Sequence, residues 1–237
     1  MKQLALGVKL RTHAVFANFS PGMNGELLAV LRGPSREPLW LWGNPGSGKT
    51  HLLQAVCAAA GEAAAYLPLD GSPALPPEAL QGFESCRVLC IDDVDLAAGQ
   101  LEWERALFRL FNEAAELHSR VIFASAAPPR QLDWRLDDWR SRAAACVVYQ
   151  VRELDESGRV EAFRLRAAQR GLQLPSETLD YLLKRMPRDL GSLFDILDEL
   201  DEASLVAQRR LTIPFIRDAL EKRAGTGPSS RTNRTPG

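Results

Sequence analysis

The stretch Gly43-Asn44-Pro45-Gly46-Ser47-Gly48-Lys49-Thr50 decides the fold class of this chain, because it fits the pattern G-x-x-x-x-G-K-[ST]. The apolar run 39–42 before it is typical of a short buried strand, and residues 51–60 after it have the apolar spacing of a helix. A glycine-rich turn between a strand and a helix lets backbone N–H groups surround a phosphate chain, and the positive end of the helix dipole favours the anion. The segment therefore predicts a nucleotide-binding P-loop.

Two side chains of this loop have separate expected roles. Lys49 is expected to reach the β- and γ-phosphates, and the hydroxyl of Thr50 to bind Mg²⁺. The other predicted nucleotide contacts come from neighbouring positions of the same turn, namely Pro45, Gly46, Ser47, Gly48 and His51. The expected cofactors are ADP or ATP with Mg²⁺.

An apolar run that ends in two carboxylates follows the P-loop by about 40 residues. Residues 88–91 predict a strand beside the phosphate loop, Asp92 is expected to hold Mg²⁺ through water, and Asp93 to orient an attacking water. Either aspartate alone would more often be a turn residue at the end of a strand. As a pair at this distance they indicate the Walker B element of a P-loop protein.

Short apolar runs alternate with helical patterns over the first two thirds of the chain, which predicts an α/β domain with a parallel sheet flanked by helices. The expected strands are 39–42, 64–69, 87–91, 121–124 and 146–151, and the expected helices 26–31, 51–60 and 103–117. After residue 151 only helices are expected, at 155–170, 176–186, 189–208 and 213–222. The predicted organisation is a tail (1–12), a nucleotide-binding α/β domain (13–151), a small all-helical domain (152–222) and a disordered polar tail (223–237).

The composition is ordinary for a globular protein, with 46% hydrophobic and 25% charged residues among 237. A net charge of −1 gives no overall attraction to nucleic acid or to a membrane. We find neither a signal-peptide pattern nor an apolar run of bilayer length, so we expect a soluble cytoplasmic protein with no membrane partner. The four cysteines and three histidines are too scattered for a metal site, and buried thiols are expected.

Two arginines stand where a guanidinium could act on a phosphate. Arg142 precedes the last strand and could reach the γ-phosphate of a neighbouring molecule, while Arg188 opens a helix of the second domain and could reach the phosphates bound by this chain. A surface arginine is usually a solvated charge. An arginine supplied in trans, however, speeds hydrolysis by about 10³–10⁵-fold.

With these elements placed, the chain resembles the DnaA-related AAA+ family, and within it the Hda-type regulatory inactivators. The resemblance extends from about residue 4 to residue 222 and is carried by Phe16-Ala17-Asn18-Phe19, by residues 127–132 (APPRQL) and by residues 207–215 (AQRRLTIPF). It implies an AAA+ P-loop domain with a parallel five-stranded sheet, followed by a helical lid. It also implies that Phe16 and Phe19 line an adenine pocket, although plain core packing would explain them as well.

The resemblance also implies partners. Gln3, Leu4 and Leu6 are similar to the peptide with which Hda-type proteins bind the DNA polymerase sliding clamp, although such a peptide by itself is more often a chance match or a simple edge strand. DnaA is the implied second partner, Arg142 would be the trans arginine finger, and DNA would be reached mostly through the clamp. Self-association is left open.

The main alternative is a self-sufficient AAA+ ATPase that acts like a helicase loader, and a third is a purely structural clamp adaptor. Ala126 stands where AAA+ ATPases place a polar sensor residue, with Ser125 one position earlier as its potential replacement, and Asp93 stands where Glu is usual. Both departures favour weak hydrolysis by the chain alone, and therefore the regulator.

Overall fold

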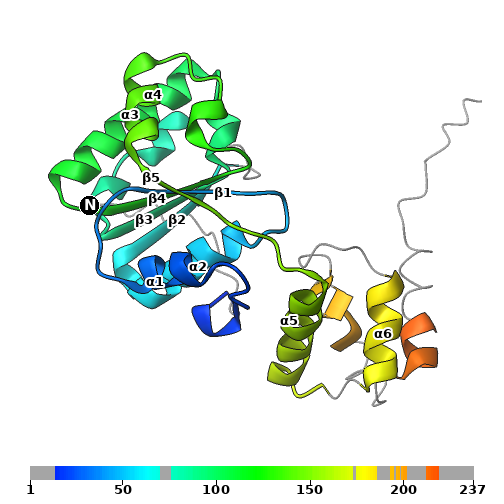
Figure 1. Cartoon of the computed structure of the whole chain (residues 1–237). Coiled ribbons are helices and arrows are strands. Elements are labelled where there is room, and N and C mark those ends of the chain that lie inside the picture. Colours follow the sequence, from blue (N-terminus) through cyan, green and yellow to red (C-terminus); the bar gives the residue numbers. More distant parts are fainter. Residues whose placement is uncertain are drawn as a thin grey trace, which may run out of the picture. The chain divides into compact units, whose positions relative to one another are not determined.

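The computed structural model describes residues 14–69, 76–172, 175–185, 193–194, 196–197, 199–201 and 212–218. The chain divides into two compact units, one ending at Arg159 and the other beginning at Val160, and each is described by itself (Figure 1). The expected tails at residues 1–12 and 223–237 lie outside the described residues.

The first unit is built on a five-stranded sheet in the order β2-β3-β4-β1-β5, in which every pair of neighbours is parallel. The strands are β1 (Leu39–Trp42), β2 (Ala64–Pro68), β3 (Val88–Asp92), β4 (Arg120–Ser125) and β5 (Val147–Gln150). The predicted parallel five-stranded sheet is confirmed. All residues of β3 and β4 are buried, as expected for strands covered on both faces.

Helices cover both faces of this sheet (Figure 1). On one face, α1 (Gly25–Arg32) and α2 (Lys49–Ala60) pack on strand residues such as Leu41 and Ile122. On the other face, α3 (Leu101–Glu116) and α4 (Asp137–Ala145) pack on Trp40 and Phe123. The alternation of side chains along each strand thus sends neighbouring residues into two separate cores.

Short 3-10 helices complete the unit: η1 (Phe16–Asn18), η2 (Gly61–Ala63), η3 (Pro77–Leu80), η4 (Phe83–Ser85), η5 (Val94–Ala97) and η6 (Pro129–Gln131). Of the four cysteines, Cys57, Cys90 and Cys146 are buried thiols and Cys86 is half-buried. Burial raises the pKa of the Cys146 thiol to about 12.

The C-terminal end of α1 is tied to the sheet by Arg120, the first residue of β4. Its guanidinium donates hydrogen bonds to the carbonyls of Val30 (2.8 Å), Leu31 (2.9 Å) and Gly33 (3.2 Å). The Leu31 carbonyl, in the last turn of α1, has no partner inside the helix, and the Val30 carbonyl also accepts from the N–H of Gly33 (3.1 Å). A cation is favoured at the negative end of the helix dipole. Desolvation lowers the pKa of Arg120, so these bonds compensate for a cation that is largely removed from water.

The second unit is helical in its described part. Helix α5 (Glu156–Gln169) crosses the boundary between the units, α6 (Ser176–Arg185) follows, and residues 213–218 are also helical. A compact apolar core joins them through Phe163, Ala167, Leu179, Leu182, Leu193, Ile196, Leu197, Leu200 and Ile216. An all-helical segment after the last strand was the prediction, and the described residues agree with it.

Candidate nucleotide site

The P-loop joins the end of β1 to the start of α2, in a conformation that needs its glycines. Gly46 and Gly48 have φ of 81° and 100°, in the left-handed region that glycine adopts freely. A Cβ on Gly48 would lie 2.8 Å from Cε2 of Phe19, and a Cβ on Gly43 would lie 2.6 Å from the carbonyl oxygen of Val151. The loop is therefore held closely between the segment before α1 and the end of β5.

Lys49 is the first residue of α2 and is only 8% exposed. Its ammonium donates hydrogen bonds to the carbonyls of Gly43 (2.7 Å) and Asn44 (3.1 Å), so its charge lies inside the turn of the P-loop. The first N–H groups of α2 point to the same place, since the first turn of a helix has no internal acceptors for them. Lysine and helix terminus together make this turn suited to a phosphate chain.

Asp92 ends β3 and is fully buried, yet both of its oxygens are hydrogen-bonded. Oδ2 accepts from the hydroxyls of Thr50 (2.7 Å) and Tyr66 (2.8 Å), and Oδ1 accepts from the N–H of Asp93 (3.1 Å). In the sheet, β4 lies between β1 and β3, so β3 reaches the phosphate loop through this side chain and α2 rather than by pairing with β1. The structure thus brings Thr50 and Asp92 into contact.

The pair fits a magnesium ion. A hydroxyl and a carboxylate are hard oxygen donors, and Mg²⁺ is usually held by one or two protein oxygens together with water and substrate phosphates. Thr50 would bind the ion directly and Asp92 through a water. When bound, the ion would neutralise charge on the phosphates.

Asp93 turns the chain away directly after Asp92. Its φ of 54° lies in the left-handed region, which aspartate tolerates better than most residues. It precedes η5 and is half-buried. An unusual backbone conformation next to a buried carboxylate is typical of functional sites, and it sets the direction of the second aspartate.

Tyr66, on β2, belongs to this site and was missed by the sequence analysis. Burial, followed by the charge of Asp92, raises the pKa of its phenol well above the ordinary value, so the hydroxyl stays protonated and donates. The available signal was a single tyrosine in an otherwise apolar strand (residues 64–69). Its use could not be inferred without the register of β2 on β3.

The end of β4 supplies no free hydroxyl to the site. Ser125 is fully buried, donates to the carbonyl of Ala127 (2.6 Å) and accepts from Nε1 of Trp40 (2.7 Å). Ser125 therefore has no proton left with which to replace a sensor residue. Ala126 is exposed, and its N–H donates to the carboxylate of Asp95 (3.1 Å).

The aromatic residues before α1 lie against the start of α2. The Phe19 ring contacts Gly48 and lies 5.6 Å from the His51 ring, whose Nε2 is 3.0 Å from the carbonyl oxygen of Val15. Arg32 stacks over Phe16, with 5.1 Å between its Cζ and the ring centroid. Both phenylalanines are half-buried and pack on the core beneath α1 and α2, which is compatible with either an adenine pocket or plain packing.

The P-loop tip contains the remaining predicted contacts. Asn44, Pro45 and Gly46 are exposed, and the Asn44 amide donates to the carboxylate of Glu153 (2.8 Å). Ser47 is buried, and its hydroxyl has no hydrogen-bond partner among the described residues. A buried polar group without a partner is unusual and marks a place where a ligand atom could be accepted.

Arg142 lies on the exposed side of α4, a helix that the sequence analysis did not predict. Its guanidinium makes no hydrogen bond or ion pair with any residue that the structure describes. Beside it on α4, Trp139 and Ala143 are fully buried, and Trp139 packs against Trp40, Phe111, Phe123 and Trp134. The helix is therefore fixed by its buried face, while the Arg142 side chain next to that face is exposed.

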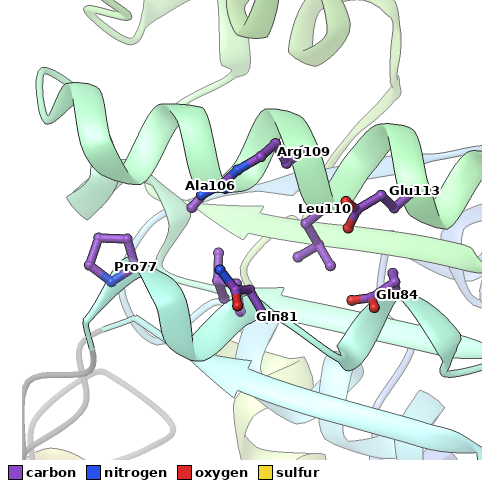
Figure 2. A pocket seen from close by; sticks show the side chains of 8 residues that line it. Pro77, Gln81, Glu84, Ala106, Arg109, Leu110 and Glu113 are labelled. Atoms are coloured by element: carbon purple, nitrogen blue, oxygen red, sulfur yellow. The ribbon is translucent and has the colours of Figure 1, made fainter.

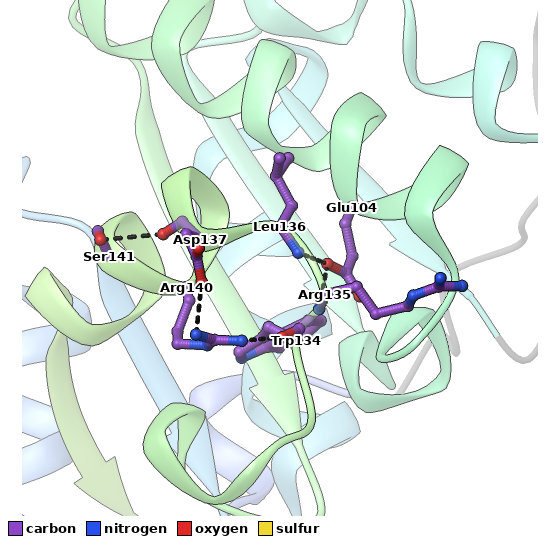
Figure 3. Close-up of polar contacts among 7 residues, drawn as sticks. All are labelled: Glu104, Trp134, Arg135, Leu136, Asp137, Arg140 and Ser141. Atoms are coloured by element: carbon purple, nitrogen blue, oxygen red, sulfur yellow. Dashed lines mark hydrogen bonds and ion pairs between the residues drawn. The ribbon is translucent and has the colours of Figure 1, made fainter.

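The N-terminal end of α4 is anchored by a buried carboxylate (Figure 3). Glu104 of α3 is fully buried and accepts hydrogen bonds from the N–H groups of Arg135 (2.8 Å), Leu136 (2.7 Å) and Gly99 (2.8 Å). The Arg140 guanidinium donates to the Asp137 carboxylate (2.6 Å) and to the carbonyl of Trp134, both of which lie close to the start of α4. These contacts fix the start of α4 and therefore the position of Arg142 on the helix.

A pocket of about 250 Å³ lies in another part of the unit, between the segment 77–84 and α3 (Figure 2). Leu80 and Leu110 contribute its apolar surface, and Arg109 and Glu113 lie on α3 at its edge. With Glu84, the lining has two carboxylates and one guanidinium, which do not indicate a particular ligand.

Four predicted site residues, Gln3, Leu4, Leu6 and Arg188, lie outside the described residues. No helix in the described part of the chain is long and apolar enough to cross a membrane.

The comparisons with known proteins agree with this architecture. A family model described as the lid domain of Hda matches residues 155–220. The structure is similar to domain III of the replication initiation protein DnaA from Thermotoga maritima, with a TM-score of 0.74 and 23% identity over 90% of this chain and 98% of that one.

Two further structures extend the comparison. AMPPCP-bound DnaA from Aquifex aeolicus gives a TM-score of 0.70 with 24% identity, over 91% of this chain and 71% of that chain. The RuvB Holliday junction branch migration motor of Thermotoga maritima gives 0.59 with 14% identity, over 82% and 64%. At these identities the likeness establishes the fold alone, which is that of DnaA domain III. The family model adds a likeness to the lid domain of Hda over residues 155–220.

Proposed function

We propose that this chain is an Hda-type negative regulator of DNA replication initiation, which promotes hydrolysis of the ATP bound to DnaA. The observation that carries the proposal is Arg142, an exposed guanidinium on a helix whose buried face and N-terminal end are anchored in the protein. A cation held in this way is suited to a phosphate on another molecule. The Hda lid match supports the same assignment.

The nucleotide of the chain itself would hold the two domains in their working form. Lys49 and the P-loop N–H groups would bind the phosphates of ADP or ATP, Thr50 and Asp92 the Mg²⁺, and Phe16 and Phe19 the base. Arg188, in a lid of residues 152–222, would contact the phosphates and make the position of the lid depend on the bound nucleotide. AMPPCP is bound in the similar DnaA structure, which supports a nucleotide in this fold.

Hydrolysis by the chain alone is expected to be weak. Ala126 offers no polar side chain at the end of β4, and the hydroxyl of Ser125 is used by Ala127 and Trp40. Asp93 could still orient a water, but its side chain is one methylene shorter than the usual Glu. The chemistry would then take place in DnaA, where Arg142 would stabilise the charge that develops on the γ-phosphate.

The remaining partners follow from the N-terminal peptide. Gln3, Leu4 and Leu6 would bind the sliding clamp, with the amide in a polar subsite and the leucines in an apolar one. DNA would then be reached through the clamp, which suits a chain with a net charge of −1. We place this activity in the cytoplasm.

The test is a reconstituted hydrolysis assay. DnaA loaded with γ-labelled ATP is mixed with clamp-loaded DNA and the full chain, and phosphate release is followed. We expect release to accelerate only when chain and clamp are both present. Equal release with and without the chain would refute the proposal.

The second candidate is a self-sufficient ATPase, which the contact between Thr50 and Asp92 favours. A single-turnover experiment with the purified chain and ATP separates the two. Fast hydrolysis without DnaA would support the second candidate, and hydrolysis only in the DnaA assay would support the regulator.

A further inference from the structure

Three elements of the first unit meet at one carboxylate. Thr50 from α2 and Tyr66 from β2 both donate to Oδ2 of Asp92 on β3, at 2.7 and 2.8 Å. The N–H of Asp93 lies 3.1 Å from the other oxygen, Oδ1. The P-loop motif accounts for Thr50 and the Walker B motif for Asp92, but neither accounts for Tyr66.

We propose that Tyr66 is a positioning residue for the magnesium–nucleotide complex, acting through Asp92. The inference rests on the proposed nucleotide site. The Tyr66 hydroxyl holds the Asp92 carboxylate in the orientation in which it accepts a metal-bound water, and it does so without touching the metal or the nucleotide.

The register of the sheet explains why this position can do so. Tyr66 is paired with Cys90, and Asp92 lies two residues farther along β3, so both side chains leave the sheet on the face that α2 covers. Thr50 stands in the first turn of α2 on that same face. Pairing of β2 with β3 thus fixes the distance between the phenol and the carboxylate.

The two hydroxyls have different tasks. Thr50 would offer a lone pair to Mg²⁺ while its hydroxyl still donates to Asp92, whereas the Tyr66 hydroxyl donates to the carboxylate and accepts from the side chain of Gln54. With a single donor on Oδ2, the Asp92 carboxylate would be free to adopt other orientations. A site that holds a hydrated Mg²⁺ ion needs the carboxylate in one orientation. The Mg²⁺-dependent part of nucleotide affinity should therefore depend on Tyr66, and the part supplied by Lys49 and the P-loop should not.

The experiment measures ADP affinity of the full chain by calorimetry, once with Mg²⁺ and once with EDTA. In wild type we expect Mg²⁺ to strengthen binding. In Tyr66→Phe, which removes one oxygen atom, we expect the strengthening to fall by about 5- to 10-fold, in line with the net contribution of a typical hydrogen bond. Affinity in EDTA should change by less than about twofold, because the phosphate contacts remain.

A matched control is Tyr149→Phe on β5, where the tyrosine is also half-buried. It should leave both affinities unchanged, and melting curves of the two variants without nucleotide show whether each is folded. A second measurement reads the metal directly, as Mn²⁺ binding in the presence of saturating ADP by electron paramagnetic resonance. We expect weaker Mn²⁺ binding in Tyr66→Phe alone.

The outcomes separate the inference from the proposed function. If wild type binds ADP and Tyr66→Phe retains the full effect of Mg²⁺ and of Mn²⁺, the inference is wrong and the nucleotide site stands. If wild type binds no nucleotide, the nucleotide site itself is wrong and the role of Tyr66 is refuted with it. In Asp92→Asn the additional change Tyr66→Phe should have no further effect on Mg²⁺, and a full further loss there would refute a role through Asp92.

Discussion

The nucleotide edge of the sheet and the outer side of α4 treat their charged groups in opposite ways. At the nucleotide edge, Lys49 and Asp92 are buried and hydrogen-bonded to their own chain. On α4, Arg142 is exposed and has no described partner, while Trp139 and Glu104, which hold the helix, are buried. The first arrangement suits a ligand that stays with the chain, and the second suits contact with another molecule.

This difference predicts that the two regions can be separated by mutation. A change at the P-loop should alter what the chain binds and how stable it is. A change of Arg142, on the exposed side of α4, should alter only the rate of ATP hydrolysis in the partner DnaA.

The largest effect is expected for Arg142→Ala. Acceleration of DnaA hydrolysis should fall by about 10³-fold or more, because a trans arginine contributes about 10³–10⁵-fold. The melting temperature should stay within about 2 °C of wild type, as for other exposed substitutions. Phosphate release and thermal unfolding measure the two quantities.

Arg105→Ala on α3 is the control for that substitution, since Arg105 is also an exposed arginine, paired only with Glu102 at 2.8 Å in the described structure. Acceleration should be unchanged, because a surface ion pair of this kind contributes little. Equal losses in the two variants would mean that general charge, rather than the position of Arg142, is responsible.

The anchor of α4 should give the next largest effect. Glu104→Ala leaves three partly buried N–H groups without their acceptor and should lower the free energy of unfolding by about 3 kcal/mol. Glu104→Gln, which keeps one acceptor oxygen, should lose less. Urea unfolding measures both, and wild-type stability in the Ala variant would show that Glu104 does not hold α4.

The two Glu104 variants also test whether the two regions act independently. Acceleration of DnaA hydrolysis should decrease with the loss of the anchor, whereas ADP affinity should remain near that of wild type. A loss of ADP affinity equal to the loss of acceleration would mean that the regions are not independent.

Lys49→Ala should give a smaller change in stability, seen only with nucleotide. At 100 times the dissociation constant a ligand stabilises the folded state by about 2.7 kcal/mol, and the variant should lose most of this. The test compares melting temperatures with and without ADP. A wild-type melting temperature that ADP does not change would contradict the nucleotide site.

Much of the fold could be predicted because its signals are local. The P-loop, the strands and helices α1, α2 and α3 follow from glycine positions and apolar spacing, and every predicted strand is present. Helix α4 could not be predicted in this way, since only Trp139 and Ala143 among its nine residues are buried. Its polar sequence gives too weak a periodicity to separate a helix from a loop.

The residues of the site also fall into a predictable and an unpredictable group. Lys49, Thr50 and Asp92 belong to motifs with fixed spacing and were predicted together. Tyr66 and Glu104 act through the pairing of strands and the packing of helices, which bring residues 26 and 31–32 positions apart into contact. That the Ser125 hydroxyl already accepts a hydrogen bond could likewise not be inferred until the fold places Trp40 beside it.

The central claim is that Arg142 acts in the nucleotide site of another molecule. The most direct test is a structure of the full chain bound to DnaA that carries a non-hydrolysable ATP analogue. The account predicts the Arg142 guanidinium within hydrogen-bond distance, about 3 Å, of a γ-phosphate oxygen of the DnaA nucleotide. A complex in which that guanidinium faces solvent, with the nucleotide of DnaA contacted by other groups, would contradict it.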